Sequence, residues 1–168
     1  IFTEIPHVLP LKYDPLKDIK PVAELARGNL VLIVNPAFPA RNLAELIAHT
    51  KANPGKLSYA SYSAGTSSHY AGQILNARAG LDLQHVPYRG GPPGLIDVMA
   101  GQVPMMFDSL PNCLAAIRAG KVRPIAMLAE SRSVHLKDVP TFKELGYPEL
   151  SFIVSVSAYV RSEEHTSE

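Results

Sequence analysis

Short apolar runs alternate along the chain with segments whose apolar residues recur at helical spacing. The run NLVLIVNP, residues 29–36, is rich in β-branched residues and closes on Asn-Pro, which is typical of a buried strand. Residues 40–56 carry Leu43, Leu46 and Ile47 at helical spacing and stop at Asn-Pro-Gly. The two patterns repeat, and they predict strands at 56–62, 83–88, 103–108, 122–128 and 151–160 and helices at 66–79, 92–100, 111–119 and 141–146.

Alternating strands and helices predict an α/β sheet of parallel strands joined by crossover helices. Three expected helices end in Ala-Gly, at Gly80, Gly101 and Gly120, and glycine accepts the left-handed backbone that ends a helix. These turns lie on the edge where strands begin. Ligands bind outside the carboxyl ends of parallel strands, so we predict a site on the opposite edge, formed by the loops SAGTSS (63–68), YRGGPP (88–93) and FDSLP (107–111).

The loop SAGTSS offers hydroxyl groups at the expected start of a helix, on Ser63, Thr66, Ser67 and Ser68. The helix adds unpaired backbone N–H groups and the positive end of its dipole, which attract a carboxylate or a phosphate. The alternative is that Thr66 or Ser67 only caps the helix, contributing about 1 kcal/mol. His69, in the first turn, is either a ligand-binding or loop-ordering group or a plain exposed helix residue.

The other two loops carry an aromatic and two charged side chains. Tyr88 and Arg89 stand at a strand end before two glycines, which let a backbone approach a ligand closely. Arg89 could pair with a carboxylate, but a solvated surface charge is the favoured interpretation. Asp108 could cap the helix near Pro111 or accept a hydrogen bond from a ligand, although its charge opposes a ligand carboxylate at short range.

A serine hydrolase is the enzymatic alternative, and it needs a nucleophile, a base and an orienting acid. The elbow G-x-S-x-G is absent from the loop, and neither His69 nor His85 has a carboxylate partner evident in the sequence. This alternative predicts turnover of an ester that is lost in Ser63→Ala and Ser67→Ala. No dinucleotide fingerprint, P-loop or zinc spacing appears in the sequence.

Composition narrows the classes of protein further. The chain has 168 residues, enough for one domain, and 46% of them are hydrophobic, enough for a real core. The formal net charge of +1 argues against a nucleic-acid partner, and no apolar run reaches membrane-spanning length. A single cysteine, Cys113, excludes an internal disulfide, and we expect it to be buried in a helix.

Arg161–Glu168, RSEEHTSE, is polar and unlike the rest of the chain. A common sequencing-adapter sequence can encode these residues, so we interpret them as an assembly artefact and exclude Glu163, Glu164 and His165 as metal ligands. On this interpretation the natural protein continues past Val160, and the chain is a fragment.

Over residues 9 to about 160, the sequence resembles the substrate-binding proteins of tripartite tricarboxylate transporters, the Bug family of extracytoplasmic solute receptors. The resemblance rests on the order and spacing of several segments together. They are LPLKYDPLKDIKPVAEL, NPGKLSYASYSAGTSSHYAGQIL, HVPYRGGPPGLIDVMAGQVPMMFDSLP, IRAGKVRPIAM and DVPTFKELGYPE.

The resemblance implies a type II periplasmic-binding-protein fold, in which two α/β lobes close over a small carboxylate. It implies a periplasmic, monomeric protein that delivers a di- or tricarboxylate, or a similar acid, to a membrane permease without entering the membrane itself. The resemblance also implies no cofactor, no metal and no catalysis. Arg89 stands where lysine is frequent in the family. The ligand-binding residues that we predict are Ser63, Ala64, Gly65, Thr66, Ser67, His69, Tyr88 and Asp108.

The resemblance also implies how the chain divides into lobes. Most of it is the second lobe, residues 34–153, and residues 154–160 form the return crossing strand. Residues 1–33 hold part of the first lobe and one crossing strand, although the proline-rich stretch 1–21, judged alone, predicts an irregular lead-in. With half of its cleft in the missing lobe, the chain alone is expected to bind weakly or not at all.

A second class of protein, the effector domain of a bacterial transcription regulator, can share this two-lobed fold. It would require a helix-turn-helix upstream of the chain. A signal peptide in that position would support the receptor instead, and the segments quoted above favour the receptor.

Overall fold

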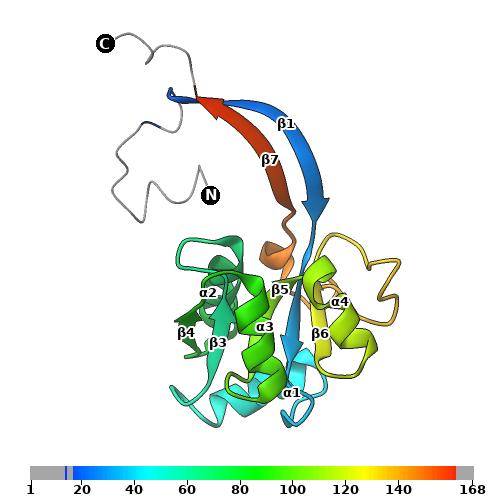
Figure 1. Ribbon diagram of the computed structural model, residues 1–168. Coiled ribbons are helices and arrows are strands. Elements are labelled where there is room, and N and C mark those ends of the chain that lie inside the picture. Colours follow the sequence, from blue (N-terminus) through cyan, green and yellow to red (C-terminus); the bar gives the residue numbers. More distant parts are fainter. Residues whose placement is uncertain (1–13, 15–16, 162–168) are drawn as a thin grey trace.

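The computed structural model describes Asp14 and residues 17–161, which form an α/β lobe and a long two-stranded ribbon rising from it (Figure 1). A five-stranded sheet of order β4-β3-β5-β2-β6 is the centre of the lobe. Its strands are β2 (Leu30–Val34), β3 (Ser58–Ser61), β4 (Gln84–Pro87), β5 (Met105–Ser109) and β6 (Arg123–Leu128). The helices are α1 (Leu43–Lys51), α2 (Ser67–Ala79), α3 (Gly91–Ala100) and α4 (Leu110–Arg118).

The sheet is mixed, so the prediction of an all-parallel sheet is wrong for one strand. β3 pairs in parallel with β4 and β5, but β2 is antiparallel to both of its neighbours, with Leu30 opposite Ser109 and Leu128. The reason is the path of the chain: it comes directly from the ribbon into β2, without the crossover helix that a parallel pairing needs. β3, β4, β5 and β6 still end at one edge, which confirms the predicted grouping of the loops.

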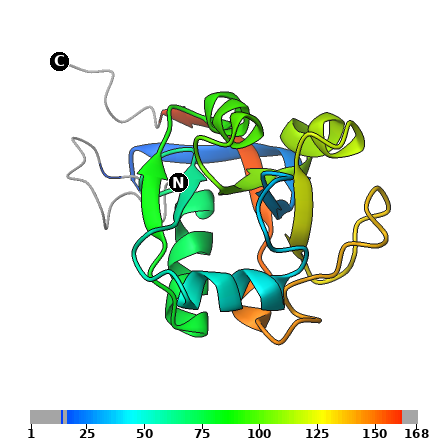
Figure 2. The same cartoon turned by 90° about the horizontal axis from the view of Figure 1, so that it is seen from below.

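Helices cover both faces of the sheet, which gives the lobe two cores (Figure 2). Alternate residues of β2 face opposite sides: Leu32 packs in the core with α1 and α2, and Ile33 packs in the core with α3 and α4. All five side chains of β2 are buried, as expected for a central strand. Cys113 lies buried in α4 as a free thiol, which confirms its predicted place.

The Ala-Gly pairs end helices as predicted. Gly80 and Gly101 take left-handed conformations with φ of 63° and 76° as the caps of α2 and α3, and Gly120 has φ of 67° just after α4. These turns lie at the edge where β4, β5 and β6 begin. The polar, glycine-containing loops are thereby left on the other edge.

The predicted helix at 141–146 is wrong, because tertiary pairing takes the chain there into a turn. Thr141 forms a parallel bridge with Met127, and the N–H of Phe142 donates to the Met127 carbonyl at 2.9 Å. Gly146 then turns the chain with φ of 88°, so only a single helical turn fits. The short 3₁₀ helix nearby comes later, at Pro148–Leu150.

The ribbon consists of β1 (Ile19–Gly28) and β7 (Val154–Arg161), paired antiparallel and directed away from the lobe (Figure 1). The first residues of β1 fall in the stretch predicted to be irregular, and residues 1–13, 15–16 and 162–168 lie outside the described residues. The division into lobes stays a prediction. The lobe's sheet includes all of β2, of which residues 30–33 belong to the expected segment 1–33.

Candidate carboxylate-binding site

The loop between β3 and α2 presents polar groups at the carboxyl edge of the sheet. Ser63 and Ala64 are exposed, and Gly65 makes the turn with φ of 74°. Thr66 holds the predicted N-cap position of α2, but its Oγ1 donates to the Ser63 carbonyl at 2.8 Å and makes no capping bond. Thr66 therefore braces the loop instead of closing the end of the helix.

The first N–H groups of α2 stay open as a result. Within the part of the chain that the structure describes, no protein group accepts from the backbone N–H of Ser67, Ser68 or His69. Ser68 is fully buried, but Ser67 and His69 are partly exposed. Their two N–H donors at a helix start, with the partly exposed hydroxyl of Ser67 beside them, form a cradle suited to an oxyanion. We call Ser63–Ser67 the clamp loop.

Two histidines pack together beside the clamp loop. The His69 and His85 rings stack with centroids 4.0 Å apart, although the residues come from α2 and β4. His69 Nδ1 accepts from the Gly65 N–H at 3.1 Å, a contact that requires a neutral ring with its proton on Nε2. His69 is thus a loop-ordering group in this structure.

Burial disfavours the charged form of both rings. It lowers the pKa of His69 below the ordinary value, and it lowers the pKa of His85 to about 4, with a further contribution from the nearby His69. His85 Nε2 lies 2.6 Å from the hydroxyl of Ser61, which also contacts the Ser63 carbonyl at 3.1 Å. Two neutral histidines and a buried serine therefore form a hydrogen-bonded group that contacts the clamp loop at Gly65 and at the Ser63 carbonyl.

Asp108 is fully buried and hydrogen-bonded through both of its oxygens. Oδ1 accepts from the Tyr62 hydroxyl and the Ser109 backbone N–H, each at 2.8 Å, and Oδ2 accepts from Asn112 Nδ2 at 2.8 Å. Burial raises the pKa of Asp108, and these hydrogen bonds partly offset the shift. Burial and the Asp108 charge raise the pKa of Tyr62, so its hydroxyl stays a neutral donor.

Tyr88 and Arg89 lie just after the end of β4, as predicted, and they differ in their surroundings. The Tyr88 hydroxyl donates to Asp97 in α3 at 2.7 Å, and burial raises the Tyr88 pKa to about 12. Arg89 is exposed, which agrees with the solvated interpretation. A backbone contact joins this loop to the residue directly before the clamp loop: the N–H of Gly90 donates to the Tyr62 carbonyl at 2.9 Å.

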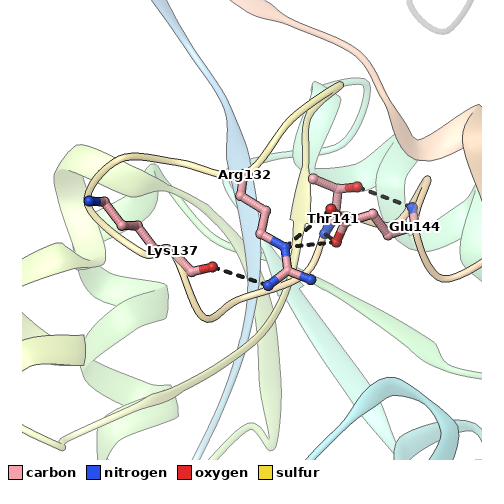
Figure 3. Close-up of polar contacts among 4 residues, drawn as sticks. All are labelled: Arg132, Lys137, Thr141 and Glu144. Atoms are coloured by element: carbon pink, nitrogen blue, oxygen red, sulfur yellow. Dashed lines mark hydrogen bonds and ion pairs between the residues drawn. The ribbon is translucent and has the colours of Figure 1, made fainter.

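The segment after β6 also carries a polar network, which sequence reasoning missed (Figure 3). Arg132 Nε donates to the Glu144 carboxylate at 2.9 Å, and its NH1 donates to the Lys137 carbonyl at 3.1 Å. Glu144 in turn accepts from the Thr141 N–H, and its own N–H donates to the Thr141 hydroxyl, both at 3.1 Å. The Arg132 side chain therefore stabilises the conformation of this segment through its bonds to Glu144 and the Lys137 carbonyl.

Ser61 and Tyr62 were also missed by the sequence reasoning, although both stand directly before the clamp loop. Ser61 and His85 resemble a nucleophile–base pair, but no described carboxylate contacts either histidine ring. No cluster of three potential metal ligands occurs among the described residues. Over the same residues, no helix combines the length and the apolar character needed to cross a membrane.

Comparison with known proteins decides the family. The family described as "Tripartite tricarboxylate transporter family receptor" matches residues 1–162. The chain belongs to this receptor family. BugT of Bordetella pertussis is 36% identical over 139 residues, which cover 83% of this chain and 43% of BugT. The chain spans less than half the length of the first curated relatives that it matches.

Solved structures of relatives confirm the fold of the receptor. MatC from Rhodopseudomonas palustris, solved with bound malate, is 30% identical with a TM-score of 0.87 over 92% of this chain and 53% of MatC. Another R. palustris protein, solved with adipate, is 29% identical with a TM-score of 0.86 over 92% of this chain and 52% of its own. The receptor is thus a Bug-family, periplasmic-binding-protein-like α/β protein, represented here by part of its length.

Proposed function

We propose that the receptor captures a small carboxylate in the periplasm and passes it, unaltered, to a membrane permease. The open N–H groups and hydroxyls of the clamp loop at the start of α2 carry the proposal, since they form a cradle for one carboxylate group. The malate and adipate bound by relatives support a dicarboxylate ligand. The absence of a carboxylate beside the described pair Ser61 and His85 supports binding without catalysis.

The predicted ligand-binding residues remain predictions, and the structure supports some of them more strongly than others. Ser63, Ala64, Thr66 and Ser67 form the exposed or partly exposed rim that a ligand can reach, and Gly65 is buried at the turn between them. The donors at the start of α2 and the hydroxyl of Ser67 suit one carboxylate of the acid, whereas the Thr66 hydroxyl already donates to the Ser63 carbonyl. The part of the relatives' length that this chain does not span would hold the rest of the ligand, and one receptor molecule would suffice to close around it.

Calorimetry of the full-length receptor against malate, adipate and citrate tests the proposal. We expect heat of binding with at least one acid and none with the corresponding neutral amides, because the clamp loop recognises negative charge. Turnover of an ester probe without binding of any of these acids would contradict the proposal and favour a hydrolase.

Two substitutions at Ser67 separate its backbone donor from its hydroxyl. Ser67→Ala removes only the hydroxyl, whereas Ser67→Pro also removes the N–H at the first position of α2, where proline is tolerated. The preceding Thr66 is extended, with φ of −98° and ψ of 162°, as a residue before proline must be. A hydrogen bond to a charged group contributes about 1.5–3 kcal/mol, so Ser67→Pro should weaken binding by roughly tenfold to a hundredfold beyond Ser67→Ala.

Ser58→Ala is the matched control, because Ser58 begins β3 at the opposite edge of the sheet. We expect it to bind like the wild type. Equal affinities for Ser67→Ala and Ser67→Pro would show that the N–H of residue 67 does not contact the ligand.

The 168-residue chain by itself should bind the same acid at least about tenfold more weakly than the full-length receptor, because one lobe supplies only part of the contacts. Parallel titrations of the two proteins measure the difference. Equal affinity would mean that this lobe holds the complete site.

A further inference from the structure

Three loops of the carboxyl edge meet at the buried side chain of Asp108. Tyr62 follows β3, Asn112 lies in the first turn of α4 after β5, and both side chains donate to the Asp108 carboxylate at 2.8 Å. Gly91, the first residue of α3 after the loop that follows β4, lies against the same group. A Cβ added at Gly91 would be 2.8 Å from Asn112 Nδ2, 3.1 Å from Tyr62 Cε1 and 3.3 Å from Asp108 Oδ1.

The geometry leaves Asp108 little room to contact a ligand. Its side chain has no exposed surface, and both of its oxygens already accept hydrogen bonds from described residues. Burying a carboxylate is costly unless it is hydrogen-bonded, so the contacts to Tyr62, Ser109 and Asn112 are required for the residue to be there at all. Such a satisfied network rigidifies the elements that it joins.

Tyr62 transmits this rigidity to the clamp loop, because it is the residue directly before Ser63. Its hydroxyl is held by Asp108, and its carbonyl accepts from the Gly90 N–H at 2.9 Å. The side chain and the backbone of Tyr62 are therefore both fixed at the point where the chain leaves β3. The start of the clamp loop cannot shift without breaking one of these bonds.

We propose that Asp108 is a positioning residue, which holds the clamp loop in its ligand-ready shape by joining the loops after β3, β4 and β5. This inference rests on the proposed function, since it assigns to that site a group that acts without touching the ligand. It also replaces the ligand contact expected of Asp108 from the sequence with an indirect role.

Exchanging the two partners Asp108 and Asn112 tests the proposal. Asn112→Asp places a second carboxylate against the first, and like charges at this distance repel. An acidic side chain in the first turn of α4 suits the helix dipole, so this variant is expected to fold. Asp108→Asn should be milder, because Asn112 can turn its amide oxygen toward the new donor.

The double variant Asp108→Asn/Asn112→Asp restores the pairing with the roles reversed. The amide oxygen at position 108 still accepts from Tyr62 and from the Ser109 N–H, and its nitrogen donates to the new carboxylate at position 112. Asp82→Asn is the matched control, because Asp82 is exposed and lies before β4, at the opposite edge.

Two measurements on the full-length receptor at pH 8 complete the test: titration with malate and amide hydrogen exchange of residues 62–67. In Asn112→Asp we expect malate affinity to fall on the order of tenfold and clamp-loop exchange to accelerate. At pH 5 the loss should shrink, because the two carboxyl groups can then share a proton. The double variant should recover both the affinity and the exchange protection.

Three results would overturn the proposal, and each differs from failure of the proposed function. The first is unchanged loop exchange in Asn112→Asp. The second is a double variant as defective as Asn112→Asp. The third is a double variant that recovers loop protection but not affinity, which would make Asp108 a direct ligand contact. If the wild type binds none of the acids, the carboxylate function fails, while hydrogen exchange still tests the positioning role.

Discussion

Replacing Gly72 with alanine is expected to lower the free energy of unfolding of the lobe by about 2 kcal/mol. A Cβ at Gly72 would lie 2.1 Å from two carbons of the Tyr59 ring. That ring is fully buried, packs edge-on against Phe107 with centroids 6.1 Å apart, and donates its hydroxyl to the His69 carbonyl at 3.1 Å. The ring cannot yield without breaking these contacts, and their loss outweighs the helix propensity that alanine adds, about 1 kcal/mol.

Gly94→Ala is the matched control, since it adds the same methyl group to a buried position in α3. There the nearest atom is the Met106 sulfur at 3.0 Å, the far end of a flexible side chain that can adjust. We expect a change close to zero, because the gain in helix propensity offsets the repacking. Denaturant unfolding of both variants gives the comparison, and a Gly72→Ala protein as stable as Gly94→Ala would refute this account of the packing around Tyr59.

Acid should destabilise the protein through the stacked pair His69 and His85. The pKa of His85 falls from 6.5, its ordinary value, to about 4 in the folded protein, and the pKa of His69 is also lowered. Between these values the unfolded chain binds more protons than the folded one, so the free energy of unfolding decreases as the pH falls from 6.5 toward 4. One pKa unit corresponds to about 1.4 kcal/mol. After solvent screening of a partly exposed ring, we expect His85 to account for roughly 1–2 kcal/mol by pH 4.

Comparison of variants isolates this contribution from the rest of the protein. His85→Gln should flatten the dependence of unfolding free energy on pH, measured by urea titrations from pH 7 to pH 4. His135→Gln, at an exposed position outside the pair, should keep the wild-type slope. The raised pKa of Asp108 has the opposite effect, because it increases the free energy of unfolding as the pH falls. Asp108 is present in the wild type and in both variants, so its contribution cancels when their slopes are compared. Equal slopes for His85→Gln and the wild type would rule out the pair as the source.

Local patterns were sufficient to predict most of the elements, because each of them is encoded within a short stretch. The β-branched run of β2, the helical spacing in α1 and the glycines that end α2 and α3 all act through neighbours in the chain. The failure at 141–146 has a nonlocal cause: pairing of Thr141 with Met127 competes with the helical tendency of the segment. The direction of β2 is nonlocal as well, since it depends on where the ribbon delivers the chain.

In the candidate site, too, some features could be predicted from local sequence and others depend on the tertiary structure. The sequence was enough to place Ser63, Gly65, Thr66 and Ser67 at a strand end and a helix start, since loop composition and element order decide which edge a loop occupies. It could not tell which hydroxyls stay free. Thr66 holds the N-cap position as predicted, yet its hydroxyl bonds to the Ser63 carbonyl, a choice made by the turn at Gly65.

By itself, therefore, the sequence determined the order of the elements, the edge that carries the polar loops and the family of the receptor. The tertiary structure alone decided the stacking of His69 on His85, the burial of Asp108 and its bonds to Tyr62 and Asn112. These contacts join residues 4 to 46 positions apart in the chain. Side-chain chemistry gives each residue its possible partners, but only the packing of strands and helices brings one of those partners within hydrogen-bonding distance.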